Sequence, residues 1–148
     1  MKNVLMDVES TRPMDTFKFG EILGGKAKPG MVVCLSGDLG TGKTVFAKGF
    51  GRGLGITEPV VSPTFTIVSE YREGRLPLFH FDTYRIEDPD EMYEVGLDEY
   101  LYGEGVCLIE WPEMIEDLLT DEYLLVTIEK NPEKGEDYRK ITLYEVRK

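Results

Sequence analysis

The stretch Gly37-Asp38-Leu39-Gly40-Thr41-Gly42-Lys43-Thr44 matches the phosphate-binding loop pattern G-x-x-x-x-G-K-[ST] at every fixed position. In such a loop, glycines let successive backbone N–H groups turn inward around a phosphate. The lysine brings an ammonium to the β- and γ-phosphates, and the final hydroxyl ligates Mg²⁺. The sequence therefore predicts that residues 37–44 bind the phosphates of a nucleotide.

The segments on either side of the loop support this prediction. Residues 31–36 are an apolar run typical of a buried strand, and residues 44–50 are typical of a helix that leaves the loop. A helix in this position points its dipole and its free N–H groups at the phosphates. Strand, loop and helix in this order indicate an α/β fold.

The rest of the chain predicts a P-loop NTPase-like mixed β-sheet with helices on both faces. We expect further strands over residues 4–8, 60–71, 78–82, 106–110, 124–130 and 140–146. The second and third of these are predicted to pair as an antiparallel hairpin that turns at Glu73-Gly74. We expect further helices from residues 10–15 to 29–30, from an N-cap at Asp88 to Gly96, and over 112–119.

Length and composition indicate one domain over residues 1–148. Cys34 and Cys107 each lie in an apolar run, so we interpret them as buried core residues in a reducing compartment. No segment approaches the roughly 18 apolar residues of a membrane span, and the N-terminus lacks the apolar region of a signal peptide. We therefore expect a cytoplasmic protein with no membrane association.

The formal net charge of −11 argues against direct nucleic-acid binding, which normally uses a basic face. Any RNA in the function of this protein is expected to be engaged through a partner. Acidic residues are densest over residues 87–104, where a solvated helix face and a docking surface for a basic partner both remain open.

Nucleotide hydrolysis also requires a carboxylate at the end of a second strand. Residues 106–110 form an apolar run that ends in Glu110, as expected of a buried parallel strand, and we assign this acid to the metal. Residues 78–82 end in Asp82, which we assign to the attacking water or to the outer coordination of the metal. Either acid also fits a helix cap or a loop position.

Three neighbouring features leave alternatives open. His80, the only histidine, shares strand parity with Asp82 and fits either a structural residue or a His–Asp pair near the phosphates. Arg85 fits an arginine finger or a surface salt bridge. The segment Ser62-Pro63-Thr64-Phe65-Thr66 fits a plain turn or a switch that senses the γ-phosphate.

Four ordered motifs between residues 36 and 112 together resemble the bacterial TsaE (YjeE) family, the ATPases of tRNA threonylcarbamoyladenosine biosynthesis. They are the phosphate-binding loop, S-P-T-F-T at 62–66, H-F-D-x-Y-R at 80–85 and I-E-W-P at 109–112. The resemblance implies a weak Mg²⁺-dependent ATPase that acts beside two partners, TsaB and TsaD. In that pathway TsaD transfers a threonylcarbamoyl group to the adenosine beside the tRNA anticodon, so tRNA would be engaged only indirectly.

The resemblance also implies roles for single residues. Lys43 and Thr44 would contact phosphate and Mg²⁺, Glu110 would be the Walker B acid on Mg²⁺, and Asp82 would lie near the γ-phosphate. Trp111 resembles the tryptophan that follows the metal acid in the family. The ATP contacts predicted in this way are Gly37, Asp38, Leu39, Gly40, Thr41, Gly42, Lys43, Thr44, Val45, Thr64, Arg139 and Thr11, with Ser10 as a further candidate.

Three other classes of protein compete with this interpretation. A GTPase would need an N-K-x-D base-reading motif, and the sequence has none. A small-molecule kinase usually has a lid with several arginines, whereas the arginines here are scattered. A nucleotide-binding module with incidental turnover is compatible with the sequence.

Overall fold

A computed structural model of the protein describes residues 1–38, 40–63 and 67–148. Within these residues, seven strands form one sheet in the order β1-β7-β6-β2-β5-β4-β3. The strands are β1 (Lys2–Ser10), β2 (Val32–Ser36), β3 (Val68–Tyr71), β4 (Leu78–Asp82), β5 (Val106–Glu110), β6 (Glu122–Lys130) and β7 (Arg139–Arg147). The central strands β4, β5, β2 and β6 are parallel, and the other pairings are antiparallel. The sheet is therefore mixed, as predicted.

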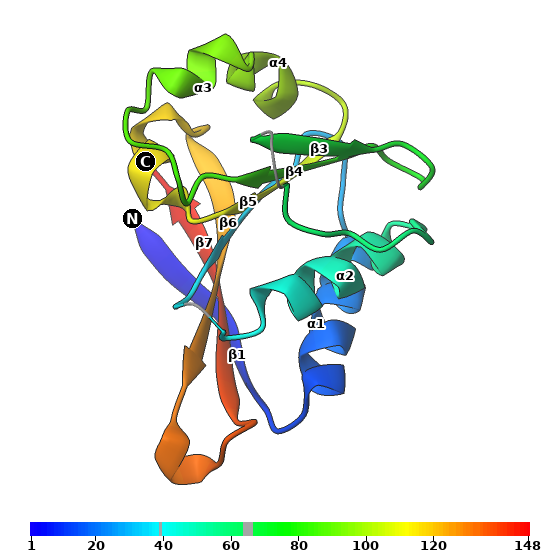
Figure 1. Ribbon diagram of the computed structural model, residues 1–148, viewed down its shortest axis with the longest axis vertical. Helices are drawn as coiled ribbons and strands as arrows, with labels where there is room; N and C mark the ends of the chain where they lie inside the picture. Colours follow the sequence, from blue (N-terminus) through cyan, green and yellow to red (C-terminus); the bar gives the residue numbers. More distant parts are fainter. Residues whose placement is uncertain (39, 64–66) are drawn as a thin grey trace.

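Helices cover both faces of the sheet (Figure 1). On one face lie α1 (Pro13–Gly25) and α2 (Lys43–Gly53), and the core between them and the sheet includes Phe46 and Phe50. The other face carries α3 (Glu91–Glu94), α4 (Leu97–Leu101) and the 3-10 helix η1 (Pro112–Leu118) over a second core that includes Phe81. A short 3-10 turn, η2 (Pro132–Lys134), links β6 to β7. The predicted α/β architecture is confirmed.

Two helices end or bend differently from the prediction. The first ends at Gly25, before Pro29, because the pair Gly24-Gly25 weakens the helix and the Lys26 N–H closes the last turn on the carbonyl of Ile22 (3.2 Å). The helix predicted over 112–119 is a 3-10 helix that is bent at Ile115, whose side chain is fully buried in the second core. The free energy gained by burying the Ile115 side chain therefore exceeds the cost of departing from regular helical geometry.

Two other elements start later than predicted. The strand predicted over 60–71 begins only at Val68, because Val61 bonds to side chains instead of to a neighbouring strand. The antiparallel pairing of β3 with β4 is nevertheless confirmed. The helix predicted from Asp88 begins at Glu91, whose carboxylate accepts the backbone N–H of Asp88 (3.2 Å), as expected of a capping box.

Helices α1 and α2 approach each other backbone to backbone through glycines. A Cβ atom at Gly24 would lie 2.2 Å from the carbonyl oxygen of Phe50, and one at Gly49 would lie 2.0 Å from that of Phe17. Only glycine fits at such distances. This contact fixes α2, and with it the helix N-terminus that follows the phosphate-binding loop.

Candidate nucleotide-binding and active site

The phosphate-binding loop connects the C-terminal end of β2 to the N-terminus of α2. Gly40 and Gly42 have φ angles of +77° and +104°, a region that favours glycine. A Cβ atom at Gly37 would lie 2.7 Å from the carbonyl oxygen of Ile128. The fixed glycines of the motif are therefore required by backbone geometry. Leu39, a predicted ATP contact, lies outside the described residues.

Lys43 is held against the loop and against an aromatic ring. Its Nζ donates to the carbonyl oxygen of Gly37 (2.7 Å) and lies 3.2 Å from the centroid of the Trp111 ring. Burial lowers the pKa of Lys43, and the nearby carboxylates of Glu110 and Asp82 act in the opposite direction. The ammonium is thus placed between the loop and the acids predicted to act with it.

The predicted catalytic residues meet in one cavity of about 370 Å³. Its lining residues are Gly40, Gly42, Lys43, Thr44, Ser62, Asp82, Glu110 and Trp111. Asp82 ends β4 and Glu110 ends β5, and the two are register partners in this parallel pair. Because parallel strands present their carboxyl ends at the same edge of a sheet, both acids lie beside the phosphate-binding loop.

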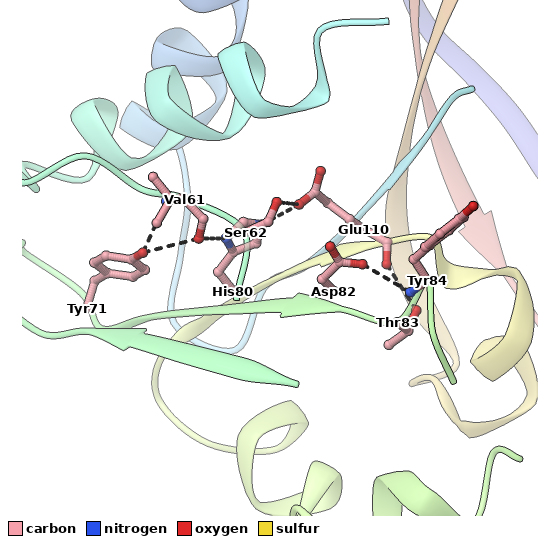
Figure 2. Close-up of polar contacts among 8 residues, drawn as sticks. All are labelled: Val61, Ser62, Tyr71, His80, Asp82, Thr83, Tyr84 and Glu110. Carbon is pink, nitrogen blue, oxygen red and sulfur yellow. Dashed lines mark hydrogen bonds and ion pairs between the residues drawn. The ribbon is translucent and has the colours of Figure 1, made fainter. Parts of the chain in front are cut away.

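Glu110 is buried and held by two side chains. Its Oε2 accepts a hydrogen bond from the Ser62 hydroxyl (2.9 Å) and lies 2.8 Å from His80 Nε2 (Figure 2). Burial raises the pKa of Glu110, but the bonds from His80 and Ser62 and the charge of Lys43 outweigh this and hold it below its ordinary value. The carboxylate is therefore ionised at neutral pH.

Asp82 is less buried than Glu110 and bonds to the following turn. Its Oδ1 accepts the backbone N–H of Tyr84 (3.0 Å), and the Thr83 hydroxyl donates to the backbone carbonyl oxygen of Glu110 (3.0 Å) (Figure 2). These bonds fix the end of β4 against the end of β5. They also leave Asp82 at the lining of the cavity, where water has access.

His80 does not form the pair with Asp82 that strand parity allowed. The imidazole is 1% exposed, and its partners are Glu110 and the carbonyl oxygen of Val61. A ring buried this deeply needs a partner for each nitrogen, and Glu110 and Val61 supply them, whereas Asp82 bonds to the turn at the end of β4. Arg85 is exposed and bonds to no other described residue, so neither interpretation of it gains support.

A second cavity of about 220 Å³ lies on the other side of the loop. It is lined by Pro13, Thr16, Gly40, Thr41, Gly42, Val45, Asp137 and Arg139. Arg139 donates to the carbonyl oxygens of Thr41 (2.8 Å) and Gly40 (3.3 Å), so it lies against the loop, and its contact with ATP stays a prediction. Nothing in the sequence pattern had singled out Pro13 and Thr16.

The ATP contacts predicted near the N-terminus, Thr11 and Ser10, do not line this cavity themselves. Thr11 is exposed, bonds to the Asp15 carboxylate (3.2 Å from its N–H) and does not line the cavity. Ser10 bonds to the hydroxyl of Thr16 (2.9 Å), which does line it. Thr64 lies outside the described residues.

Trp111 is the only non-glycine residue with a positive φ among the described residues, at 59°. Its ring also lies 4.8 Å from the ring of Tyr84, so an aromatic residue follows each of the acids that end β4 and β5. Backbone strain of this kind concentrates at functional sites. Tyr84 belongs to the H-F-D-x-Y-R motif but had no predicted role.

The donor atoms in the larger cavity fit Mg²⁺. The Thr44 hydroxyl and the carboxylates of Glu110 and Asp82 are hard oxygen ligands, and Mg²⁺ typically binds to one or two carboxylates plus phosphates and waters. Across the described residues, no cluster of three or more His, Cys, Asp or Glu could hold a metal ion by itself. Likewise, none of the described helices has the length and apolarity to cross a bilayer.

Comparison with known proteins places these features in one family. Residues 10–141 match the family described as "Threonylcarbamoyl adenosine biosynthesis protein TsaE". The tRNA threonylcarbamoyladenosine biosynthesis protein TsaE of Bacillus subtilis is 50% identical over 133 residues, which cover 90% of this chain and 81% of the relative. The protein of the same name from Nostoc sp. is 47% identical over 116 residues, 76% of this chain and 68% of the relative.

A solved structure supports the same assignment. The crystal structure of Bacillus subtilis YdiB matches the fold with a TM-score of 0.79 at 40% sequence identity, covering 99% of this chain and 86% of that chain. The family match spans the loop, both acids and Arg139, all of which lie within residues 10–141. This chain therefore belongs to the TsaE family.

Proposed function

We propose that this chain is an ATP-binding, weakly ATP-hydrolysing accessory protein of tRNA threonylcarbamoyladenosine biosynthesis. Its relatives carry the name of that pathway. The observation that carries the ATPase part of the proposal is the 370 Å³ cavity, which joins Lys43 and Thr44 to two carboxylates from neighbouring strands.

Each residue in this cavity has a distinct proposed role. Lys43 exchanges the Gly37 carbonyl for phosphate oxygens, and Thr44 and Glu110 hold Mg²⁺. Asp82, at the accessible end of β4, orients the attacking water. When bound, Mg²⁺ supplies positive charge against the β- and γ-phosphate oxygens.

The nucleotide is proposed to lie across the phosphate-binding loop. Gly40 and Gly42 line both cavities, so a triphosphate over the loop reaches from the acids to the pocket of Val45 and Arg139. The N-terminal N–H groups of α2 face the phosphates in this arrangement. ATP is proposed over GTP because the sequence lacks the N-K-x-D motif.

The proposed partners are TsaB and TsaD, with TsaD as the transferase and tRNA engaged only through that pair. A net charge of −11 leaves little attraction for tRNA phosphates. A cytoplasmic location, suggested by two free buried cysteines, belongs to the same proposal.

A reconstituted transfer assay tests this function. Purified TsaB and TsaD, tRNA and the threonylcarbamoyl adenylate are combined with the wild-type chain, with its Lys43→Ala variant, or with neither. We expect sustained transfer only with the wild-type chain and ATP. Equal transfer in all three reactions would refute the accessory role, and equal transfer with ADP and ATP would favour a nucleotide-binding module.

A further inference from the structure

The two oxygens of the Glu110 carboxylate have different surroundings. Oε2 contacts His80 Nε2 (2.8 Å) and the Ser62 hydroxyl (2.9 Å). None of the described residues bonds to Oε1, and Figure 2 shows the second oxygen pointing away from His80 and Ser62. One oxygen is therefore anchored by the protein and the other is available to the cavity.

His80 is itself braced from the opposite side. Its Nδ1 lies 3.2 Å from the carbonyl oxygen of Val61, on the side of the ring away from Glu110. The Tyr71 hydroxyl accepts the N–H of Val61 (3.2 Å) and donates to its carbonyl (3.4 Å). Figure 2 shows this chain of contacts running from Tyr71 through Val61 and His80 to Glu110.

The backbone of β4 gives His80 little freedom. Phe79 and Phe81, on either side of His80, are buried in the second core. His80 is the register partner of Leu108 on β5. The imidazole is fully buried, with 1% of its side chain exposed, and each ring nitrogen faces one oxygen atom. A rigid ring with two opposed nitrogens can connect a backbone carbonyl to a carboxylate in this way, and no other side chain among the described residues does so here.

We propose that His80 is a positioning residue for the metal: it fixes Glu110 through Oε2 so that Oε1 is presented to Mg²⁺. This inference rests on the proposed function of Glu110. Partners that orient a metal ligand typically contribute tenfold to a hundredfold in metal affinity or activity. His80 touches neither nucleotide nor metal in this proposal and acts only through Glu110.

Two substitutions of His80 distinguish the contact made by Nε2 from the contact made by Nδ1. In His80→Gln the amide nitrogen can occupy the place of Nε2 and donate to Glu110, whereas in His80→Asn it can occupy the place of Nδ1 and donate only to Val61. Mn²⁺ affinity is measured by electron paramagnetic resonance on each ADP-bound protein. We expect His80→Asn to bind Mn²⁺ about tenfold to a hundredfold more weakly than the wild type, and His80→Gln to retain most of the affinity.

Turnover and two further variants complete the test. At saturating Mg²⁺ the KM for ATP should change little in His80→Asn, whereas kcat falls and the Mg²⁺ concentration that turnover requires rises. Tyr71→Phe removes the hydroxyl that bonds to the backbone of Val61 and leaves both bonds to Glu110 in place. It should therefore leave Mn²⁺ affinity unchanged. Ser62→Ala, which removes the other donor to Oε2, should weaken Mn²⁺ binding in the same direction and keeps the proposal testable if His80→Asn fails to fold.

Wild-type Mn²⁺ affinity in folded His80→Asn, or in Ser62→Ala if that variant must stand in, would overturn the proposal. Equal losses in His80→Asn and Tyr71→Phe would also overturn it, because the effect would then come from the Val61 segment. The Mn²⁺ measurement needs no hydrolysis, so a wild-type protein without turnover would refute the proposed ATPase and leave this result intact.

Discussion

Substitution of Lys43 tests whether the loop binds phosphate. Its ammonium bonds to the carbonyl oxygen of Gly37 and lies on the ring of Trp111, and Lys43 and Trp111 both line the cavity that holds the two acids. Charge-assisted hydrogen bonds contribute about 1.5–3 kcal/mol each. Lys43→Ala should therefore weaken ATP binding roughly tenfold to a hundredfold.

Lys48→Ala is the matched control, because Lys48 is an exposed lysine on the same helix. Calorimetric titration with ATP and Mg²⁺ compares the two variants, and circular dichroism verifies their folding. Unchanged affinity in a folded Lys43→Ala protein would remove the phosphate-binding claim.

The two acids should separate metal binding from turnover. Glu110→Gln removes the charge that is proposed to hold Mg²⁺, so Mg²⁺-dependent ATP binding and hydrolysis should both fall. Asp82→Asn should spare binding and reduce kcat, because the role proposed for Asp82 is to orient the attacking water. Titrations and steady-state kinetics on both variants decide the assignment, and the reverse pattern would exchange the two roles.

At the scale of elements, glycine contacts hold α2 and its loop against α1. Gly24 and Gly25 are adjacent, but a Cβ atom would lie 2.2 Å from a backbone oxygen at Gly24 and 3.9 Å from one at Gly25. Overpacking should make Gly24→Ala less stable by about 1–3 kcal/mol. Gly25→Ala should be unchanged or more stable by up to about 1 kcal/mol, because alanine restricts the unfolded chain.

Urea unfolding of the two variants measures this difference directly. A Gly24→Ala protein as stable as Gly25→Ala would show that the two helices do not approach as closely as the structure has them.

Elements with a strong local signal could be predicted from the sequence. The loop, the buried strand that ends in Glu110 and the alternation of β4 are predictable because a motif, a continuous apolar run and a period of two, respectively, specify them. The bend at Ile115 and the late start of β3 are not, because burial and side-chain bonds from distant residues decide them. The bond between His80 and Glu110 could not be predicted for the same reason. It joins two different strands, and the alternation of side chains within one strand says nothing about contacts with another.

At the scale of the whole molecule, charge distinguishes a protein partner from tRNA. A chain with a net charge of −11 should bind free tRNA weakly. Binding to tRNA gains free energy when Lys and Arg side chains displace counterions from the tRNA phosphates, and this chain has few basic side chains relative to its acidic ones. We expect the ATP-bound chain to associate with the TsaB–TsaD pair more tightly than the ADP-bound chain. The association should weaken with salt if charge dominates it.

Binding assays at two salt concentrations, with ATP or ADP and with free tRNA as the alternative ligand, test this association. Tight binding to tRNA without the partners, or an affinity for the pair that is indifferent to the nucleotide, would contradict the account.

The most direct test of the central claim is ATP turnover by the wild-type chain measured alone, with TsaB and TsaD, and with both partners plus tRNA. We predict slow Mg²⁺-dependent turnover alone, a change in rate when the partners are present, and loss of turnover in Glu110→Gln under every condition. Turnover that persists in Glu110→Gln, or that does not respond to the partners, would contradict the claim that this cavity is the active site of an accessory ATPase.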